Sequence, residues 1–303
     1  MMKQYPRDLV GYANQPPHPE WPDNAKIAVQ FVINYEEGGE NCILHGDVAS
    51  EAFLSEIANA QPWPGKRHLS MESIYEYGSR AGFWRLHRLF TQHKLPVTVF
   101  GVGMALERNP SAVNAMLAAD WEIASHGYRW IDYHAVDEET ERAHIQKALD
   151  THQALIGKEP EGWYIGRTSE NSRRLILENA SPLYDADDYS DDLPFWIEGP
   201  DNKPHLIIPY TLDVNDMCFA SNQGFNSGNE FFSYLKDTFD VLYAEGDTQP
   251  KMMSVGLHCR LAGRPGRFAA LQHFVEYIQS INNVWVCRRA DIARHWHKYH
   301  RPG

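Results

Sequence analysis

Two adjacent carboxylates and two histidines each stand at the end of an apolar, strand-like run of this 303-residue chain. Glu36 and Glu37 close the first such run, and His126 and His258 close two later ones. A carboxylate in such a place can act as a general base, and an imidazole suits proton transfer near neutral pH. We therefore take Glu36, Glu37, His126 and His258 as candidate catalytic residues for acid–base chemistry.

Each of these residues also has a simpler structural explanation. Two adjacent glutamates are often a solvated pair in a loop, and a single histidine is more often a hydrogen-bonded structural residue than a ligand. The repetition of histidine at a second strand end is what favours a site. Neighbouring side chains on a strand diverge, so one of Glu36 and Glu37 faces the site while the other faces elsewhere. The sequence does not decide which.

The strands that would position these residues are short and strongly apolar. Residues 26–34 form a nearly continuous β-branched run, which is typical of a buried strand in a parallel sheet. Similar patterns predict further strands at 96–103, 121–126, 162–167, 183–187, 206–210, 252–258 and 284–287. Helical patterns lie between them, from 72 to about 90, after Asn109 and Pro110, at 137–156 before Gly157, from about 169, at 231–244 and at 267–281.

This alternation predicts an α/β fold, either a parallel barrel or a doubly wound sheet. Polar residues favour the barrel, because barrel enzymes place their chemistry at the carboxyl ends of the strands. Arg167 and Asp213 stand at such ends together with the catalytic candidates. We predict a single domain over residues 1–303, with about seven parallel strands and a long loop insertion at about 40–70. Long loops in compact domains are usually functional.

The composition of the chain argues against two classes of binding partner, nucleic acids and membranes. The net charge of −12 and the lack of a basic run disfavour nucleic acid. No apolar run approaches the roughly 20 residues that span a bilayer, and residues 1–6 lead into polar sequence rather than into a signal core. We expect a cytoplasmic protein without a membrane partner. The four cysteines show no C-x-x-C spacing and are expected to be free thiols: Cys42, Cys218, Cys259 and Cys287.

The order of these motifs resembles the polysaccharide deacetylases of the carbohydrate esterase 4 (NodB-like) type, over roughly residues 20–290. That family has Thr-Phe-Asp-Asp after its first strand, where this chain has Asn34-Tyr35-Glu36-Glu37. A His-x-x-x-His pair is matched by His126 and Trp130, and a late Leu-His motif by Leu257 and His258. The resemblance implies a distorted (β/α) barrel.

The resemblance also implies a metal site that this chain does not complete. The deacetylases hold zinc with an aspartate and two histidines, and the metal polarises the amide carbonyl and activates water. Only Glu37 and His126 remain at those places, and Trp130 is not a metal ligand. We therefore expect no metal and no other cofactor, unless a residue such as Asp132 or His134 moves in.

A narrower branch is a better match, namely the metal-independent allantoinases, with cyclic-imide hydrolases as near relatives. Four short sequence segments carry this resemblance, at residues 36–40, 125–130, 162–169 and 212–216. The implied reaction opens the hydantoin ring of allantoin to give allantoate in purine catabolism. Three alternatives stay open: a metal-dependent N-deacetylase of a sugar amide, a hydrolase of another cyclic imide or hydantoin, and a binding module without activity.

A cyclic ureide offers several hydrogen-bond donors and acceptors, so its pocket needs matching polar groups and an apolar floor. We take Trp130, Trp163 and Tyr164 as candidate walls. The candidate hydrogen-bonding partners are Arg167, Asn215 and Asp216, although an arginine at a strand end is as often part of a structural ion pair. Residues 260–267 are interpreted as a Pro/Gly turn, and the histidine-rich tail 294–300 as the end of a solvated helix rather than a metal cluster. The long loop and the aromatics favour a homo-oligomer such as a tetramer.

Overall fold

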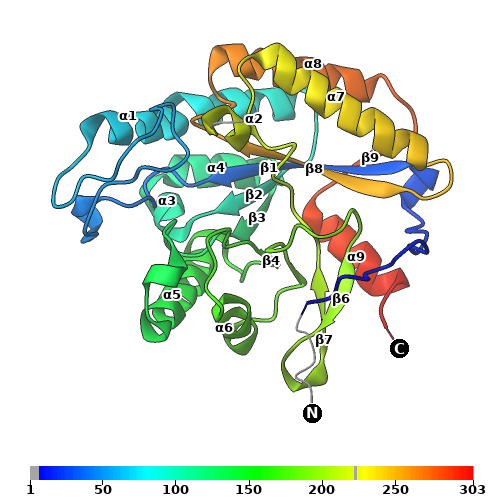
Figure 1. The fold of residues 1–303 in the computed structure, drawn as a ribbon, viewed down its shortest axis with the longest axis horizontal. Helices are drawn as coiled ribbons and strands as arrows, with labels where there is room; N and C mark the ends of the chain where they lie inside the picture. The colour runs from blue at the N-terminus through cyan, green and yellow to red at the C-terminus, as the bar shows by residue number, and fades with distance from the viewer. Residues whose placement is uncertain (1–6, 222–223, 303) are drawn as a thin grey trace.

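One sheet of nine strands organises the chain in the computed structural model, which describes residues 7–221 and 224–302 (Figure 1). The order across the sheet is β6-β7-β5-β4-β3-β2-β1-β8, and β9 pairs with β1. The strands are β1 (Ile27–Tyr35), β2 (Thr98–Gly101), β3 (Glu122–Ser125), β4 (Gly162–Trp163), β5 (Tyr184–Asp185), β6 (Phe195–Glu198), β7 (Pro204–Ile207), β8 (Lys251–His258) and β9 (Val284–Val286).

Strand β1 is paired with three other strands, near one end of the sheet. It pairs in parallel with β8 from Ile27 to Asn34, and its other edge is shared by β9 near the start and β2 near the end. The sheet curls into a half-barrel, which confirms the predicted polysaccharide deacetylase-like fold. The antiparallel strand β6 was not predicted, because Phe195–Glu198 is a short, partly exposed edge strand without a buried run.

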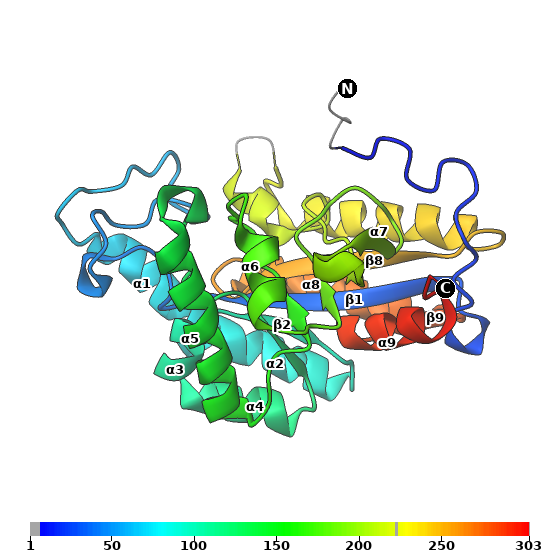
Figure 2. The same ribbon diagram turned by 90° about the horizontal axis from the view of Figure 1, so that it is seen from below.

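Most of the helices pack against the outside of the half-barrel, whereas α9 packs against the inner core through Ile292, Ala293 and Trp296. In Figure 1, α7 and α8 lie side by side along β8 and β1. Figure 2 shows β1 crossing the middle of the molecule between α7 and α9. The helices are α1 (Leu69–Tyr77), α2 (Phe83–Gln92), α3 (Gly103–Arg108), α4 (Pro110–Ala118), α5 (Glu138–Ile156), α6 (Ser172–Asn179), α7 (Gly228–Glu245), α8 (Pro265–Gln279) and α9 (Arg289–Tyr299).

Several helix ends follow the predicted signals. The Asn109 side chain accepts from the Ala112 N–H at the start of α4, and the Asp137 side chain accepts from the Thr140 N–H at the start of α5. Gly157 ends α5 at a φ of +82°, a conformation that favours glycine. The short helix α3 was not predicted, and α6 begins at Ser172 rather than near residue 169.

Side-chain alternation on β1 separates two buried layers. Residues 27, 29, 31, 33 and 35 belong to the core beneath the helices, whereas Ala28 and Val32 belong to the core inside the half-barrel. Gln30 and Asn34 lie on the same inner side, and Glu36 continues their series just past the strand. The period-two pattern therefore directs Glu36 into the mouth of the half-barrel.

The interior of the half-barrel is closed by Arg289, which is fully buried at the start of α9. Its Nη1 donates to Gln30 Oε1 at 3.0 Å and to Ser254 Oγ at 2.7 Å. Its Nη2 donates to the Pro209 carbonyl at 2.9 Å. Arg289 thus joins β1 and β8 to the segment after β7, which also meets β8 at an isolated parallel bridge between Asn215 and Gly256.

The long segment after β1 is irregular. It contains a 3₁₀ turn (Ile43–His45) and an isolated bridge between Ala49 and Pro64, and it projects beside α1 at the left of Figure 1. The four cysteines are free thiols. Of the helices in the described ranges, none is both long and apolar enough to span a membrane. The expected absence of a signal core rests on residues 1–6, which lie outside the described residues.

Candidate active site

Three of the predicted catalytic side chains meet at the mouth of the half-barrel. His126 Nε2 lies 3.3 Å from Glu36 Oε1, and His258 Nε2 lies 3.4 Å from the same oxygen. These residues stand at or just beyond the ends of β1, β3 and β8, and their side chains are only 1%, 1% and 5% exposed. One carboxylate oxygen is therefore shared between two imidazoles in a site screened from bulk water.

Asp216 holds the ring of His258 from behind. Its Oδ1 lies 2.6 Å from His258 Nδ1, and its Oδ2 accepts the backbone N–H groups of His258 and Ala262 at 2.7 and 2.8 Å. The sequence predicts a substrate-binding role for Asp216, whereas in the structure its carboxylate faces His258. The carboxylate is fully buried behind the imidazole, so it positions His258 instead.

The charges of Glu36 and His258 stabilise each other. Burial would lower the pKa of His258, but the charges of Glu36 and Asp216 raise it to about 9. Burial would likewise raise the pKa of Glu36, yet the charges of Arg260 and His258 bring it well below its usual value. At neutral pH the site therefore contains an ionised carboxylate beside a protonated imidazole.

Glu37 points in the opposite direction from Glu36. Its carboxylate packs against the π-helical turn Gly78–Gly82, where a Cβ on Gly78 would come within 2.2 Å of Oε1. Burial raises the pKa of Glu37 to about 7. The structure thus answers the question that the sequence left open, since it is Glu36 that faces the two histidines.

Arg260 is the site residue that the sequence analysis missed. It is fully buried, its Nη2 lies 2.8 Å from Glu36 Oε2, and its Nε donates to the Leu54 carbonyl at 2.9 Å. The guanidinium lies over the rings of Tyr75 and Trp130, 4.3 and 5.2 Å from their centroids. The available signal was its place two residues after a strand-end histidine, but the Pro/Gly-rich continuation indicated only a turn.

Three of the proposed pocket residues lie around this cluster. The ring of Tyr164 is 5.0 Å from that of His126. Trp130 is held by a backbone hydrogen bond to the Gly39 carbonyl, and its indole packs on Arg260. The guanidinium of Arg167 lies 5.1 Å from the centre of the Trp130 ring. These contacts keep Trp130, Tyr164 and Arg167 as candidates for substrate binding.

Two other proposed pocket residues are structural. Trp163 is fully buried on the outer side of β4, in the core that includes Leu175 and Ile176, because it alternates with the inward-facing Tyr164. Asn215 caps a 3₁₀ turn (Asp216–Ala220) through the Met217 N–H, and its Nδ2 donates to the Thr211 carbonyl. Neither side chain belongs to the pocket that we propose below.

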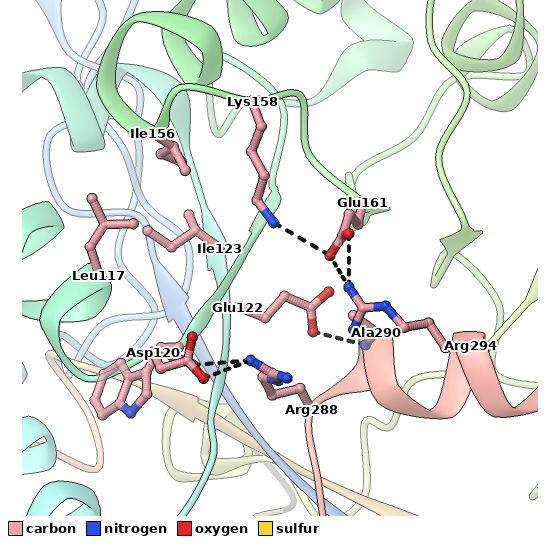
Figure 3. Close-up of a pocket in the computed structure, with 11 residues that line it drawn as sticks. Leu117, Asp120, Glu122, Ile123, Ile156, Lys158, Glu161, Arg288, Ala290 and Arg294 are labelled. Carbon is pink, nitrogen blue, oxygen red and sulfur yellow. Dashed lines mark hydrogen bonds and ion pairs between the residues drawn. The ribbon is translucent and has the colours of Figure 1, made fainter.

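A separate hollow lies at the opposite ends of the strands (Figure 3). Most of its charged groups are paired with one another: Arg294 Nη2 lies 2.7 Å from Glu161, and Lys158 Nζ lies 3.6 Å from the same carboxylate. Arg288 is paired with Asp120 at 3.2 Å. These pairs fit a structural role, because barrel enzymes place their chemistry at the other ends of the strands.

Comparison with known proteins identifies the family. Residues 68–181 match the family model described as polysaccharide deacetylase. A putative polysaccharide deacetylase of Schizosaccharomyces pombe is 47% identical over 313 residues, covering 97% of this chain and 98% of its own. The chain belongs to the polysaccharide deacetylase family. It is accordingly a hydrolase that acts on amide bonds.

Two solved structures of similar proteins superpose over nearly the whole chain. A probable polysaccharide deacetylase from Pseudomonas aeruginosa PAO1 is 60% identical, with a TM-score of 0.96, and covers 99% of this chain and 100% of its own. The structure of Puue allantoinase is 59% identical, with a TM-score of 0.97 and the same coverage.

The side chains do not fit the zinc site expected of a deacetylase. Glu37 is turned toward Gly78, Trp130 has no ligating atom, and the cation of Arg260 lies against Glu36. Within residues 7–221 and 224–302, no group of three or more His, Cys, Asp and Glu is arranged to hold a metal ion. A zinc ion beside Glu36 would also be repelled by the guanidinium of Arg260, which lies 2.8 Å from that carboxylate.

Proposed function

We propose that this protein opens the ring of a cyclic ureide, with allantoin as substrate and allantoate as product, and that it does so without a metal. The observation that carries the proposal is the contact at the barrel mouth, where Glu36 Oε1 and His258 Nε2 lie 3.4 Å apart. The 59% identity to Puue allantoinase over 99% of the chain supports the choice of substrate.

Opening a cyclic amide needs a proton acceptor for water, a donor for the departing nitrogen and stabilisation of the oxyanion. Glu36 is ionised at neutral pH and is the group that takes the proton from water. His258 is protonated and supplies the proton to the ring nitrogen, while Asp216 keeps its ring in place. His126 reaches the same carboxylate oxygen as His258, so we assign it to the oxyanion.

The pocket around the reacting bond is assigned to Trp130, Tyr164 and Arg167. The two rings provide apolar walls, and the guanidinium provides donors for the carbonyl groups of a ureide. Arg167 Nη1 lies 3.4 Å from Glu51 Oε2, so the segment after β1 contributes to this side of the pocket. A few such contacts decide between related cyclic amides.

The test is a substrate panel with the purified protein. We expect ring opening of allantoin, weaker turnover of hydantoin and dihydrouracil, and no release of acetate from N-acetylated sugar oligomers. Ring opening is followed by the appearance of the carboxylate product, and deacetylation by acetate release. Deacetylation without opening of any ring would contradict the proposal and favour the metal-dependent deacetylase.

The wider biological setting follows from the proposed substrate and from the sequence. Opening of allantoin is a step of purine catabolism. A single domain over residues 1–303, a cytoplasmic location and a homo-oligomer such as a tetramer stay predictions.

A further inference from the structure

Trp130 stands where the resemblance places the second zinc-binding histidine, and its indole is packed against a cation. The Arg260 guanidinium lies 5.2 Å from the centre of the Trp130 ring and 4.3 Å from that of Tyr75. Cation–π contacts of this kind are stronger when the cation is shielded from water, and Arg260 is fully buried. Trp130 and Tyr75 therefore form a cage around the guanidinium of Arg260, a cation that keeps its charge throughout the physiological pH range.

The cage around Arg260 is fixed on several sides. The backbone N–H of Trp130 donates to the Gly39 carbonyl at 2.9 Å, and the Tyr75 hydroxyl donates to the Phe53 carbonyl at 3.2 Å. Arg260 itself donates from Nε to the Leu54 carbonyl. These contacts aim the remaining nitrogens at the carboxylates that follow β1.

The guanidinium meets both carboxylates unequally. Nη2 lies 2.8 Å from Glu36 Oε2, whereas Nη1 lies 3.7 Å from Glu37 Oε1. The other oxygen of Glu36, Oε1, is the one shared by the two histidines. Arg260 thus binds Oε2 of Glu36 and leaves Oε1, the oxygen beside the two histidines, available to accept a proton.

We propose that Arg260, caged by Tyr75 and Trp130, is the fixed cation of this site and positions Glu36 for the reaction, in place of the zinc ion of metal-dependent relatives. This inference rests on the proposed acid–base function of Glu36. Arg260 acts through Glu36 and is a positioning residue. Trp130, which stands where the resemblance places a histidine ligand, provides one of the two rings that accommodate Arg260.

The test removes the cation and then returns it. Arg260→Ala should lower kcat by about 100-fold or more, with a smaller change in KM, because the lost contact acts on the carboxylate. Guanidinium ions, at concentrations well below those that unfold proteins, should fill the vacated space between the two rings and restore part of kcat. Urea has a similar shape without the charge and should not restore it.

Two further variants keep the test decisive if Arg260→Ala does not fold. Arg260→Lys retains a charge and Arg260→Met retains only bulk, so we expect the lysine variant to be clearly the more active. Arg264→Ala is the matched control, because Arg264 pairs with Glu56 at 3.1 Å on the rim and should leave turnover unchanged.

The inference would be overturned by near-normal kcat in Arg260→Ala, by equal rescue with urea, or by equal activity of the lysine and methionine variants. All rates are measured with whichever amide substrate the wild-type protein hydrolyses. A failure to open allantoin would count against the proposed substrate, whereas the comparison of variants decides the role of Arg260.

Discussion

Glu36→Gln should lower kcat for ring opening by about 1,000-fold or more, because a positioned general base contributes up to about four orders of magnitude. The amide keeps the shape of the side chain and removes its charge and basicity. His126 and His258 would then face a group that does not accept a proton from water. Initial rates with the proposed substrate measure the loss, and a thermal melt followed by circular dichroism shows whether the variant is folded.

Glu37→Gln is the matched control for this change. The two carboxylates are adjacent in sequence and both buried, but Glu37 faces Gly78 rather than the histidines. We expect its kcat to stay within about tenfold of wild type, since it makes no contact with the imidazoles. Equal losses in the two variants, or near-normal turnover of Glu36→Gln, would contradict the assignment of Glu36.

His258→Gln should reduce kcat by about 100-fold or more through loss of the general acid. The same assignment predicts a pH dependence. Because the pKa of His258 is raised to about 9, the protonated form persists through neutral pH and activity falls as pH rises through that value. The ion pairs of His258 stabilise the fold fully below pH 6.5 and are lost through the same alkaline range.

Asp216→Asn tests the cause of that pKa. Removing the charge 2.6 Å from His258 Nδ1 should move the alkaline limb of the rate profile to lower pH by about one unit or more. The profile is recorded as kcat/KM against pH for both proteins. An alkaline limb that stays in place in Asp216→Asn would show that another group controls it.

The sheet and most of the site were predictable because both follow from local patterns. Buried parallel strands are continuous apolar runs, and β1 and β8 are both buried along their whole length. Parallel strands also bring their carboxyl ends to one edge, so the sequence alone predicts that residues 36, 126 and 258 lie together. The edge strand β6 has no such pattern.

The errors at the site have a common physical origin. Trp163 and Tyr164 are adjacent, and only the sheet geometry shows that Tyr164 faces inward while Trp163 faces the outer core. Asp216 and Arg260 were misjudged or missed because their partners are distant in sequence. Arg260 meets Glu36 across 224 residues of chain, and no local pattern encodes such a contact.

Turnover by metal-free protein tests the central claim most directly. The protein is treated exhaustively with a chelator, its metal content is measured, and opening of allantoin is then followed with and without added zinc. We predict undiminished turnover with no stoichiometric metal and no gain on adding zinc. Loss of activity on chelation, with recovery on adding zinc, would contradict an acid–base site built from Glu36, His126, His258 and Arg260.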